Sequence, residues 1–307
     1  MKKTTIVLLA ITILALSSIA CSSAGWAIVR GSGNVEEKAY DVSGFDSIAL
    51  ATTGTVYVEM GEDERLRVEA EDNLIEHFRV EVRGNTLHIE SNEFVSLFPT
   101  QPVKFYLTAK ALNGITVSGS GDVQAPALEV DSFSIKVSGS GDIWIDELAA
   151  DGLDADITGS GEVTIADGVI GDQYIDVGGS GSYKAGDVKA LKALKVSVRV
   201  TGSGKVELGQ LEAVDLDVDI SGSGKVAIAG GTAGTQTVDI GGSGTYRAAD
   251  LMSSEADLQL SGSGSARVWA SEYLDVRITG SGGVYYKGDP TVKESITGSG
   301  DIRPIEG

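Results

Sequence analysis

The stretch Val-Ser-Gly-Ser-Gly-Asp-Val at residues 117–123 contains the motif that decides the fold, because its central Gly-Ser-Gly occurs ten times from here to residue 300. Successive central serines are separated by 20, 20, 20, 23, 20, 20, 20, 18 and 18 residues. A period near 20 that persists over so many copies is typical of stacked supersecondary units. The ten central serines are Ser120, Ser140, Ser160, Ser180, Ser203, Ser223, Ser243, Ser263, Ser281 and Ser299.

The residues around each motif alternate between apolar and polar, as expected for a strand with one buried face. An aliphatic residue such as Val117 lies three positions before each central serine, and an apolar residue such as Val123 usually lies three positions after it. Each unit is therefore expected to be a strand, a glycine corner, a second strand and a looser return. Coils about 4.8 Å apart would build a rod roughly 43 Å long.

This pattern predicts an all-β fold, a parallel β-solenoid of about ten coils of about 20 residues over residues 117–307. Glycine on both sides of each serine permits unusual backbone angles and close approach of neighbouring coils, so the serines are expected to form a structural ladder. Residues 34–116 alternate like strands but lack the motif, and we expect them to form an N-terminal β cap region continuous with the solenoid.

A longer repeat lies over the short one. Residues 137–199 match residues 200–259 as blocks of three coils, which indicates an internal duplication. In both blocks a glycine replaces the Ser or Thr before one corner, and an inward tyrosine follows it. We hypothesise that each small glycine makes room for the tyrosine of its own block. The two glycine and tyrosine pairs are Gly178 with Tyr183 and Gly241 with Tyr246.

Residues 1–20 are predicted to be an export signal, because two lysines precede an apolar run, residues 6–16, that is too short to span a bilayer. Cys21 is the single cysteine of the chain. The segment resembles a bacterial lipoprotein signal, in which that cysteine carries lipid, although Ser18 stands where an aliphatic residue is usual. We expect residues 21–33 to be a tether and the protein to be an outer-membrane lipoprotein facing the periplasm or the cell surface. A signal peptide that is cleaved in the ordinary way is the alternative.

The charge composition of the chain excludes some classes of binding partner. The formal net charge is −20, which repels nucleic acid and anionic lipid. We therefore expect the membrane to be contacted only through a lipid anchor, and we expect no cofactor.

Several residues are candidates for contacts or ligands. Three neighbouring acids could hold Ca²⁺, but two lysines occupy the same column and no metal is expected. An apolar loop at 94–98 could close the open end of the rod or form a contact surface. Three C-terminal aromatic residues could stack on sugars or cover the end of the rod. The three acids are Asp122, Asp142 and Glu162. The aromatic residues of the apolar loop are Phe94 and Phe98. The three C-terminal aromatic residues are Trp269, Tyr285 and Tyr286.

The chain resembles the head GIN domain family of auto-transporter adhesins. The resemblance rests on GSGNV at 31–35, DVSGFDSIAL at 41–50, VEAEDNLIEHF at 68–78, VSGSGDV at 117–123 and VYYKGDPTVKESITGSGDI at 284–302. It implies a right-handed, mostly parallel β-helix and an exported, often lipid-anchored protein. It carries over no binding residues.

Three functions are compatible with these observations. The first is a non-catalytic cell-envelope lipoprotein that acts as an adhesin or as a rod that binds a glycan or a surface protein. The second is a carbohydrate-active β-helix that binds or cleaves polysaccharide. The third uses the Ser and Thr columns as a flat hydrated face, as in ice-binding solenoids. We expect no enzyme, because no central serine lies in a nucleophile motif with a histidine partner and no pair of acids is singled out by spacing.

Overall fold

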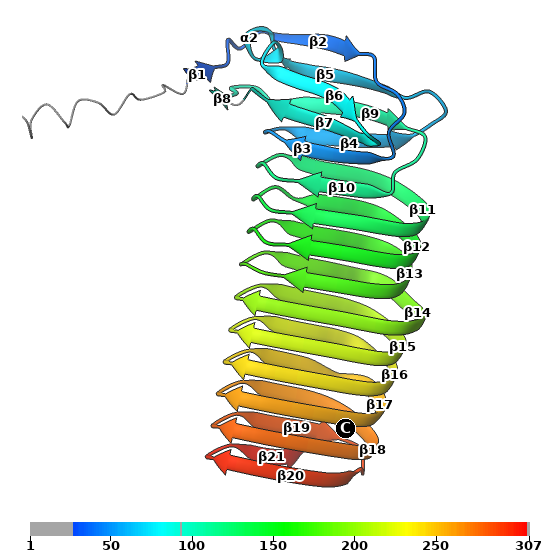
Figure 1. Ribbon diagram of the computed structural model, residues 1–307, viewed down its shortest axis with the longest axis vertical. Coiled ribbons are helices and arrows are strands. Elements are labelled where there is room, and N and C mark those ends of the chain that lie inside the picture. The colour runs from blue at the N-terminus through cyan, green and yellow to red at the C-terminus, as the bar shows by residue number, and fades with distance from the viewer. Residues whose placement is uncertain (1–26, 93, 306–307) are drawn as a thin grey trace, which may run out of the picture.

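The computed structural model describes residues 27–92 and 94–305, and it is an all-β solenoid of about nine turns. Figure 1 shows the rungs stacked along the long axis, with an N-terminal cap at one end and the last strands at the other. The predicted solenoid is thus confirmed, and the ten corners delimit its nine repeats.

The cap region contains one short helix and nine strands, which are β1 (Ala27–Arg30), β2 (Val35–Tyr40), β3 (Ser47–Ala51), β4 (Thr55–Met60), β5 (Arg65–Glu71), α2 (Asp72–Ile75), β6 (Phe78–Arg83), β7 (Thr86–Ser91), β8 (Val95–Phe98) and β9 (Lys104–Ala109). The rungs that follow are β10 (Gly114–Val117), β11 (Asp122–Val137), β12 (Ile143–Ile157), β13 (Glu162–Val177), β14 (Ser182–Gly202), β15 (Lys205–Gly222), β16 (Lys225–Gly242), β17 (Thr245–Gly262), β18 (Ser265–Gly280), β19 (Gly283–Lys287), β20 (Thr291–Gly298) and β21 (Asp301–Pro304).

Each rung pairs in parallel with the next, in the register that the motif predicts. Val137 of β11 lies beside Ile157 of β12. At the corners the amide of Ser140 donates to the carbonyl of Gly119 at 3.1 Å, and every later central serine amide donates to the first corner glycine of the preceding rung in the same way. The serines are therefore stacked through backbone bonds, and their side chains are exposed.

The corner glycines are required by the packing of one rung on the next. A Cβ atom on Gly139 would lie 1.9 Å from the carbonyl oxygen of Gly119, and one on Gly141 would lie 1.9 Å from that of Gly121. From Gly202 onward the first corner glycine also has a positive φ, for example +130° at Gly222, which side chains rarely adopt. The chain thus uses two corner conformations, and both exclude a Cβ.

The core is a continuous column of aliphatic side chains, and Tyr183 and Tyr246 are completely buried in it. The hypothesis that glycine makes room for them is wrong. Gly178 and Gly241 are exposed, and a Cβ on Gly241 would meet nothing closer than the Ser261 Oγ at 3.8 Å. Side chains alternate along a strand, so the residue just before the corner glycine faces outward and cannot free space in the core.

The cap continues the stack and then closes it. β3 pairs in parallel with β10 on one side and with β7 on the other. Beyond these strands the pairing becomes antiparallel, from β9 to β5 and from β5 to β2. The last strand, β2, is an exposed edge with the charged residues Glu36, Glu37 and Lys38, and such charges oppose edge-to-edge pairing.

The apolar loop at 94–98 does not close the rod. β8 pairs with β1 in a separate two-stranded parallel sheet beside the cap (Figure 1). Phe94 is 65% exposed and Phe98 is 55% exposed. Of the two alternatives for this loop, closure of the rod is therefore wrong, because the antiparallel strands already cover the end of the core and leave these side chains on the surface.

Candidate functional site

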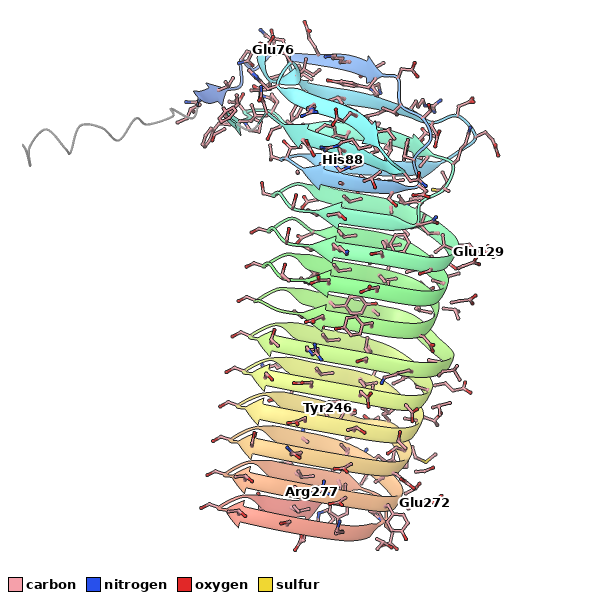
Figure 2. All side chains as sticks on the ribbon, viewed as in Figure 1. Glu76, His88, Glu129, Tyr246, Glu272 and Arg277 are labelled. Atoms are coloured by element: carbon pink, nitrogen blue, oxygen red, sulfur yellow. The ribbon has the colours of Figure 1, made fainter. Side chains whose placement is uncertain are left out.

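The solenoid presents two flat outer faces next to the corners. The post-corner face consists of the outward side chains two, four and six residues after each central serine. The pre-corner face consists of those four, six and eight residues before it. Figure 2 shows Glu129 and Glu272 projecting from the side of the rod away from the corners, whereas Tyr246 lies within the rod.

The N-terminal half of the post-corner face is acidic. The amide of Asp142 donates to the Asp122 carboxylate at 2.9 Å, and the amide of Glu162 donates to the Asp142 carboxylate at 2.7 Å. The Ser182 hydroxyl donates to Glu162 at 2.9 Å. These three acids therefore bind the rung that follows each of them, which gives the acidic column a structural role. Among the described residues, no group of three or more His, Cys, Asp or Glu could hold a metal ion.

The C-terminal half of the same face is basic. Lys205, Lys225, Arg247 and Arg267 are all exposed, on four consecutive rungs. Lys205 forms an ion pair with Glu207 at 2.6 Å. Within the part of the chain that the structure describes, the other three have no acidic partner within 4.0 Å. In a chain with a formal net charge of −20, this is a local excess of positive charge.

Trp144 is the most exposed aromatic side chain of the acidic half. It is 46% exposed, and its indole nitrogen donates to Asp146 at 2.8 Å. It lines two shallow grooves of about 360 and 230 Å³. On the cap side, Tyr57 lies in the same column and stacks on Tyr106, with ring centroids 5.6 Å apart. No pattern in the sequence indicates this pair, because the cap lacks the repeating motif.

The C-terminal aromatic residues divide between the surface and the core. Trp269 and Tyr285 lie on the post-corner face, where the Lys287 ammonium is 5.9 Å from the Trp269 ring and 2.8 Å from the Asp250 carboxylate. The Arg267 guanidinium is 5.8 Å from the Tyr285 ring. Tyr286 is half-buried and packs against the core. Two of the three predicted aromatics are thus available on one face.

The pre-corner face is predominantly acidic. Its columns hold Asp154, Asp156, Asp172, Asp176, Asp215, Asp217, Asp219, Asp239, Glu255, Asp257 and Asp275. Burial, with repulsion from Asp219, raises the pKa of the Asp239 carboxyl. A groove of about 590 Å³ on this face is bordered by Tyr273 and Lys293, and Arg277 bonds both Asp257 and Asp275 nearby (Figure 2).

A carboxylate latch fastens the start of the described chain to the cap. Glu71 is fully buried and accepts bonds from the amides of Gly33 at 2.7 Å and Thr100 at 2.8 Å. A Cβ on Gly31 would lie 1.9 Å from the Glu71 carboxylate. Ser32 meanwhile bonds the Asp72 carboxylate. The stretches 31–35 and 68–78, which carry the family resemblance, therefore meet in space.

The latch carboxyl is held in its charged form. Burial by itself raises the pKa of Glu71, but the hydrogen bonds from Thr100, Gly33 and Gln101 outweigh it and hold the pKa below its ordinary value. The sequence does not indicate this role of Glu71, because a single acid in a polar stretch has no periodic pattern.

A buried polar network surrounds Tyr246. Its hydroxyl donates to Gln236 at 2.7 Å, and the Gln236 amide donates to the Ser253 hydroxyl at 2.9 Å. Ser253 in turn donates to the Trp269 carbonyl at 3.0 Å. Tyr183 is the counterpart of Tyr246 in the first block, and its hydroxyl has no partner among the described residues. Burial raises the pKa of both tyrosines.

Two sequence predictions concern the membrane. Cys21 and the expected signal lie outside the described residues. Within the described ranges, no helix has both the length and the apolarity needed to cross a bilayer.

These observations define the class: a β-solenoid repeat protein with flat, charged outer faces and a closed N-terminal end. The chain belongs to the family described as "Putative auto-transporter adhesin, head GIN domain", which matches residues 44–209 and 188–290. This confirms the resemblance drawn from the sequence.

Solved structures show the same fold. A "putative lipid binding protein" from Parabacteroides distasonis is 26% identical over 91% of this chain and 100% of its own, with a TM-score of 0.52. A "putative adhesin" from Parabacteroides distasonis is 22% identical, and one from Parabacteroides merdae is 17% identical. Both have a TM-score of 0.50, with 91% of this chain and 100% of theirs covered. None of the curated proteins matches the sequence.

Proposed function

We propose that the protein is a non-catalytic, lipid-anchored adhesin of the cell envelope, whose rod holds flat contact faces away from the membrane. The family supports adhesion, since its description names adhesins. The Gly-Ser-Gly stack supports a rigid spacer, because each rung bonds to the next along its whole length. The contacts themselves are made by the outer faces, with a glycan or a surface protein as the partner.

The observation that carries this proposal is the cluster of exposed apolar side chains where the tether joins the rod. Ile28 on β1 is 72% exposed, and Phe94 and Phe98, which flank and end β8, are exposed beside it. Exposed apolar patches mark contact sites. A lipid on Cys21 would hold this small sheet near the bilayer, and the opposite end would then point away. The 26% identical relative is described as lipid binding, which supports the same orientation.

The proposal is tested by displaying the full-length chain and its Cys21→Ser variant on bacterial cells. We expect the wild-type chain to fractionate with membranes, to incorporate labelled fatty acid and to promote adhesion to a panel of glycans and matrix proteins. The variant should lose all three properties. Unchanged membrane association of Cys21→Ser, or adhesion equal to that of cells without the protein, would overturn the proposal. Release of unsaturated sugars from polyuronides would show that the rod is an enzyme instead.

A further inference from the structure

The charges of the post-corner face are segregated along the rod. Asp122, Asp142 and Glu162 lie on consecutive rungs on the cap side of Ser182, and Lys205 and Lys225 lie on the next two rungs beyond it, in the same column. Arg247 and Arg267 continue the basic half two residues further along their rungs. The face therefore has an acidic end, a basic end and a midpoint at Ser182.

We propose that two copies of the chain pair through their post-corner faces, antiparallel, about a two-fold axis at the rung of Ser182. Such an axis places each rung on one side of the midpoint opposite its equivalent on the other side. Glu162 then faces Lys205 of the second copy and Asp142 faces Lys225. Because the contact is isologous, each of these ion pairs forms twice. The exposed Lys184 lies on the axis and meets its own counterpart, so the four ion pairs must outweigh one repulsion between like charges.

The neighbouring columns agree with the same axis. Trp144, which projects from the face, falls opposite Ala227, a small residue that leaves room for the indole. Tyr57 falls opposite Arg267, and a guanidinium over a tyrosine ring is attractive. Near the midpoint the third column consists of small residues, Ala166, Gly186, Gly209, Ala229 and Ala249, so the two sheets can approach closely.

The charges of the pre-corner face are not divided into an acidic end and a basic end. Its acids lie on both sides of the basic rung of Lys195 and Arg199, so a two-fold axis at that rung would place Asp176 opposite Asp219. The observations therefore favour the post-corner face as the self-associating one. A separate polyanion on the basic half would leave the acidic half unexplained.

The size of the face fits a weak pair. Nine rungs about 4.8 Å apart and three columns two residues apart measure roughly 40 by 15 Å. Two copies would bury about 1,200 Å², the lower bound for specific interfaces. The central contacts are charged and close to solvent, so the pair should weaken as salt is added.

The antiparallel arrangement places the two tethered ends at opposite ends of the paired rods. Such a pair would join two facing membranes, so the second copy would be the adhesive partner on a neighbouring cell. This role rests on the function proposed above, whereas self-association rests on the face alone.

The test uses two charge-reversal variants of the full-length chain in a Cys21→Ser background. One carries Asp142→Lys and Glu162→Lys, and the other carries Lys205→Glu and Lys225→Glu. Sedimentation should show the unreversed chain as a dimer that dissociates between about 0.05 M and about 0.5 M salt. Each variant alone should bind itself about tenfold more weakly or worse, because like charges then face each other on the two rungs on either side of the midpoint. Mixed in equal amounts, the two should restore the dimer.

A monomeric unreversed chain at low salt, or a mixture no better than its components, would overturn the proposal. Circular dichroism and melting of each variant exclude misfolding as the cause. A single introduced thiol tests the relative orientation of the two copies. Position 184 lies at the midpoint, where it faces the same position of the second copy, so Lys184→Cys should form an intermolecular disulfide. Arg267→Cys, four rungs away, and Gln259→Cys, on the pre-corner face, should not. Dimers in solution without clumping of cells would refute the adhesive role and leave the pairing intact.

Discussion

The two buried tyrosines provide a natural comparison at the scale of single residues. They occupy equivalent places in the duplicated blocks and are equally buried. Only Tyr246 has a hydrogen-bond partner, Gln236, among the described residues. A polar group buried without a partner costs free energy, whereas a bonded one contributes a modest gain. The two blocks thus bury their tyrosines in the same way but differ in the hydrogen bonding of the tyrosine hydroxyl group.

We predict that Tyr246→Phe lowers the free energy of unfolding by about 1–3 kcal/mol, because it leaves the Gln236 carbonyl oxygen unpaired in the core. Tyr183→Phe should be neutral or slightly stabilising, since the hydroxyl that it removes has no partner among the residues that the structure describes. Urea unfolding of the two variants checks the difference. Equal losses at both sites would contradict it.

The glycines around the corners make a second comparison. We predict that Gly139→Ala destabilises the fold by about 3 kcal/mol, because the added methyl group meets a backbone carbonyl of the preceding rung, which cannot move alone. Gly241→Thr should change stability by about 0.5 kcal/mol or less, because it lies in an exposed column of Ser and Thr. Thermal unfolding of both variants provides the measurement. A tolerated Gly139→Ala would show that the corner can relax.

At the scale of elements, the latch connects three segments that are distant in sequence. Glu71 joins the residues after β1 to the loop that follows β8 and to the start of α2. The cap strand β2 follows directly, so loss of the latch should loosen the edge of the cap before it affects the rungs.

We predict that the stability of the fold depends on pH through the Glu71 carboxylate of the latch. The pKa of Glu71 is lower in the folded chain than the ordinary value of 4.5. Its contribution is therefore complete above about pH 4.5 and is lost as the pH falls through the folded pKa. Glu71→Gln should lower the melting temperature near pH 7 and differ less from wild type in strong acid. A constant difference across this range would exclude the carboxylate as the cause. Glu76→Gln, an exposed control, should have little effect at any pH.

The sequence predicts the register of the rungs but only the β character of the cap, for a physical reason. A parallel rung repeats its neighbour, so Val117, Val137 and Ile157 recur at a fixed interval and reveal the stack. In the cap, Arg67 pairs with Tyr106 in antiparallel fashion, and no interval records that contact. The stacked pair Tyr57 and Tyr106 was therefore invisible in the sequence.

Two interpretations of the sequence are limited for related reasons. The hypothesis that Gly178 makes room in the core neglects the alternation of side chains, which places this residue on the outside. The apolar residues from Phe94 to Phe98 are compatible with a cap and with a contact surface, because apolarity does not distinguish a covered surface from an exposed one. The sequence predicts the column that holds three acids and two lysines, whereas the extension of the basic half to Arg247 and Arg267 is evident only from the pairing of the rungs.

At the scale of the whole molecule, the two ends of the rod differ. The N-terminal end is closed by antiparallel strands, whereas β20 at the other end is exposed along its length. Glu294 of this strand pairs with Val276 and occupies an inward column that is apolar in the preceding rungs. An inward charge on an edge strand opposes the addition of further strands. The last rung is thus protected by one side chain.

We predict that Glu294→Val promotes association of rods through their C-terminal ends, because it completes an apolar strip with Val292 and Ile296, which are already 36% and 39% exposed. Light scattering should show a concentration-dependent rise in mass that persists in high salt. The conservative variant Glu294→Gln, which keeps a polar group at the edge, should remain like wild type. An unchanged mass for Glu294→Val would show that backbone geometry protects this end.

The three-coil duplication has a consequence for evolution. A unit whose upper and lower surfaces match can be copied in tandem without redesign of its neighbours, and each extra turn lengthens the molecule by about 4.8 Å. Unequal recombination between such copies can therefore adjust the span of the molecule in fixed increments. Whatever gap this protein bridges, descendants could fit a wider or narrower one by gaining or losing whole turns.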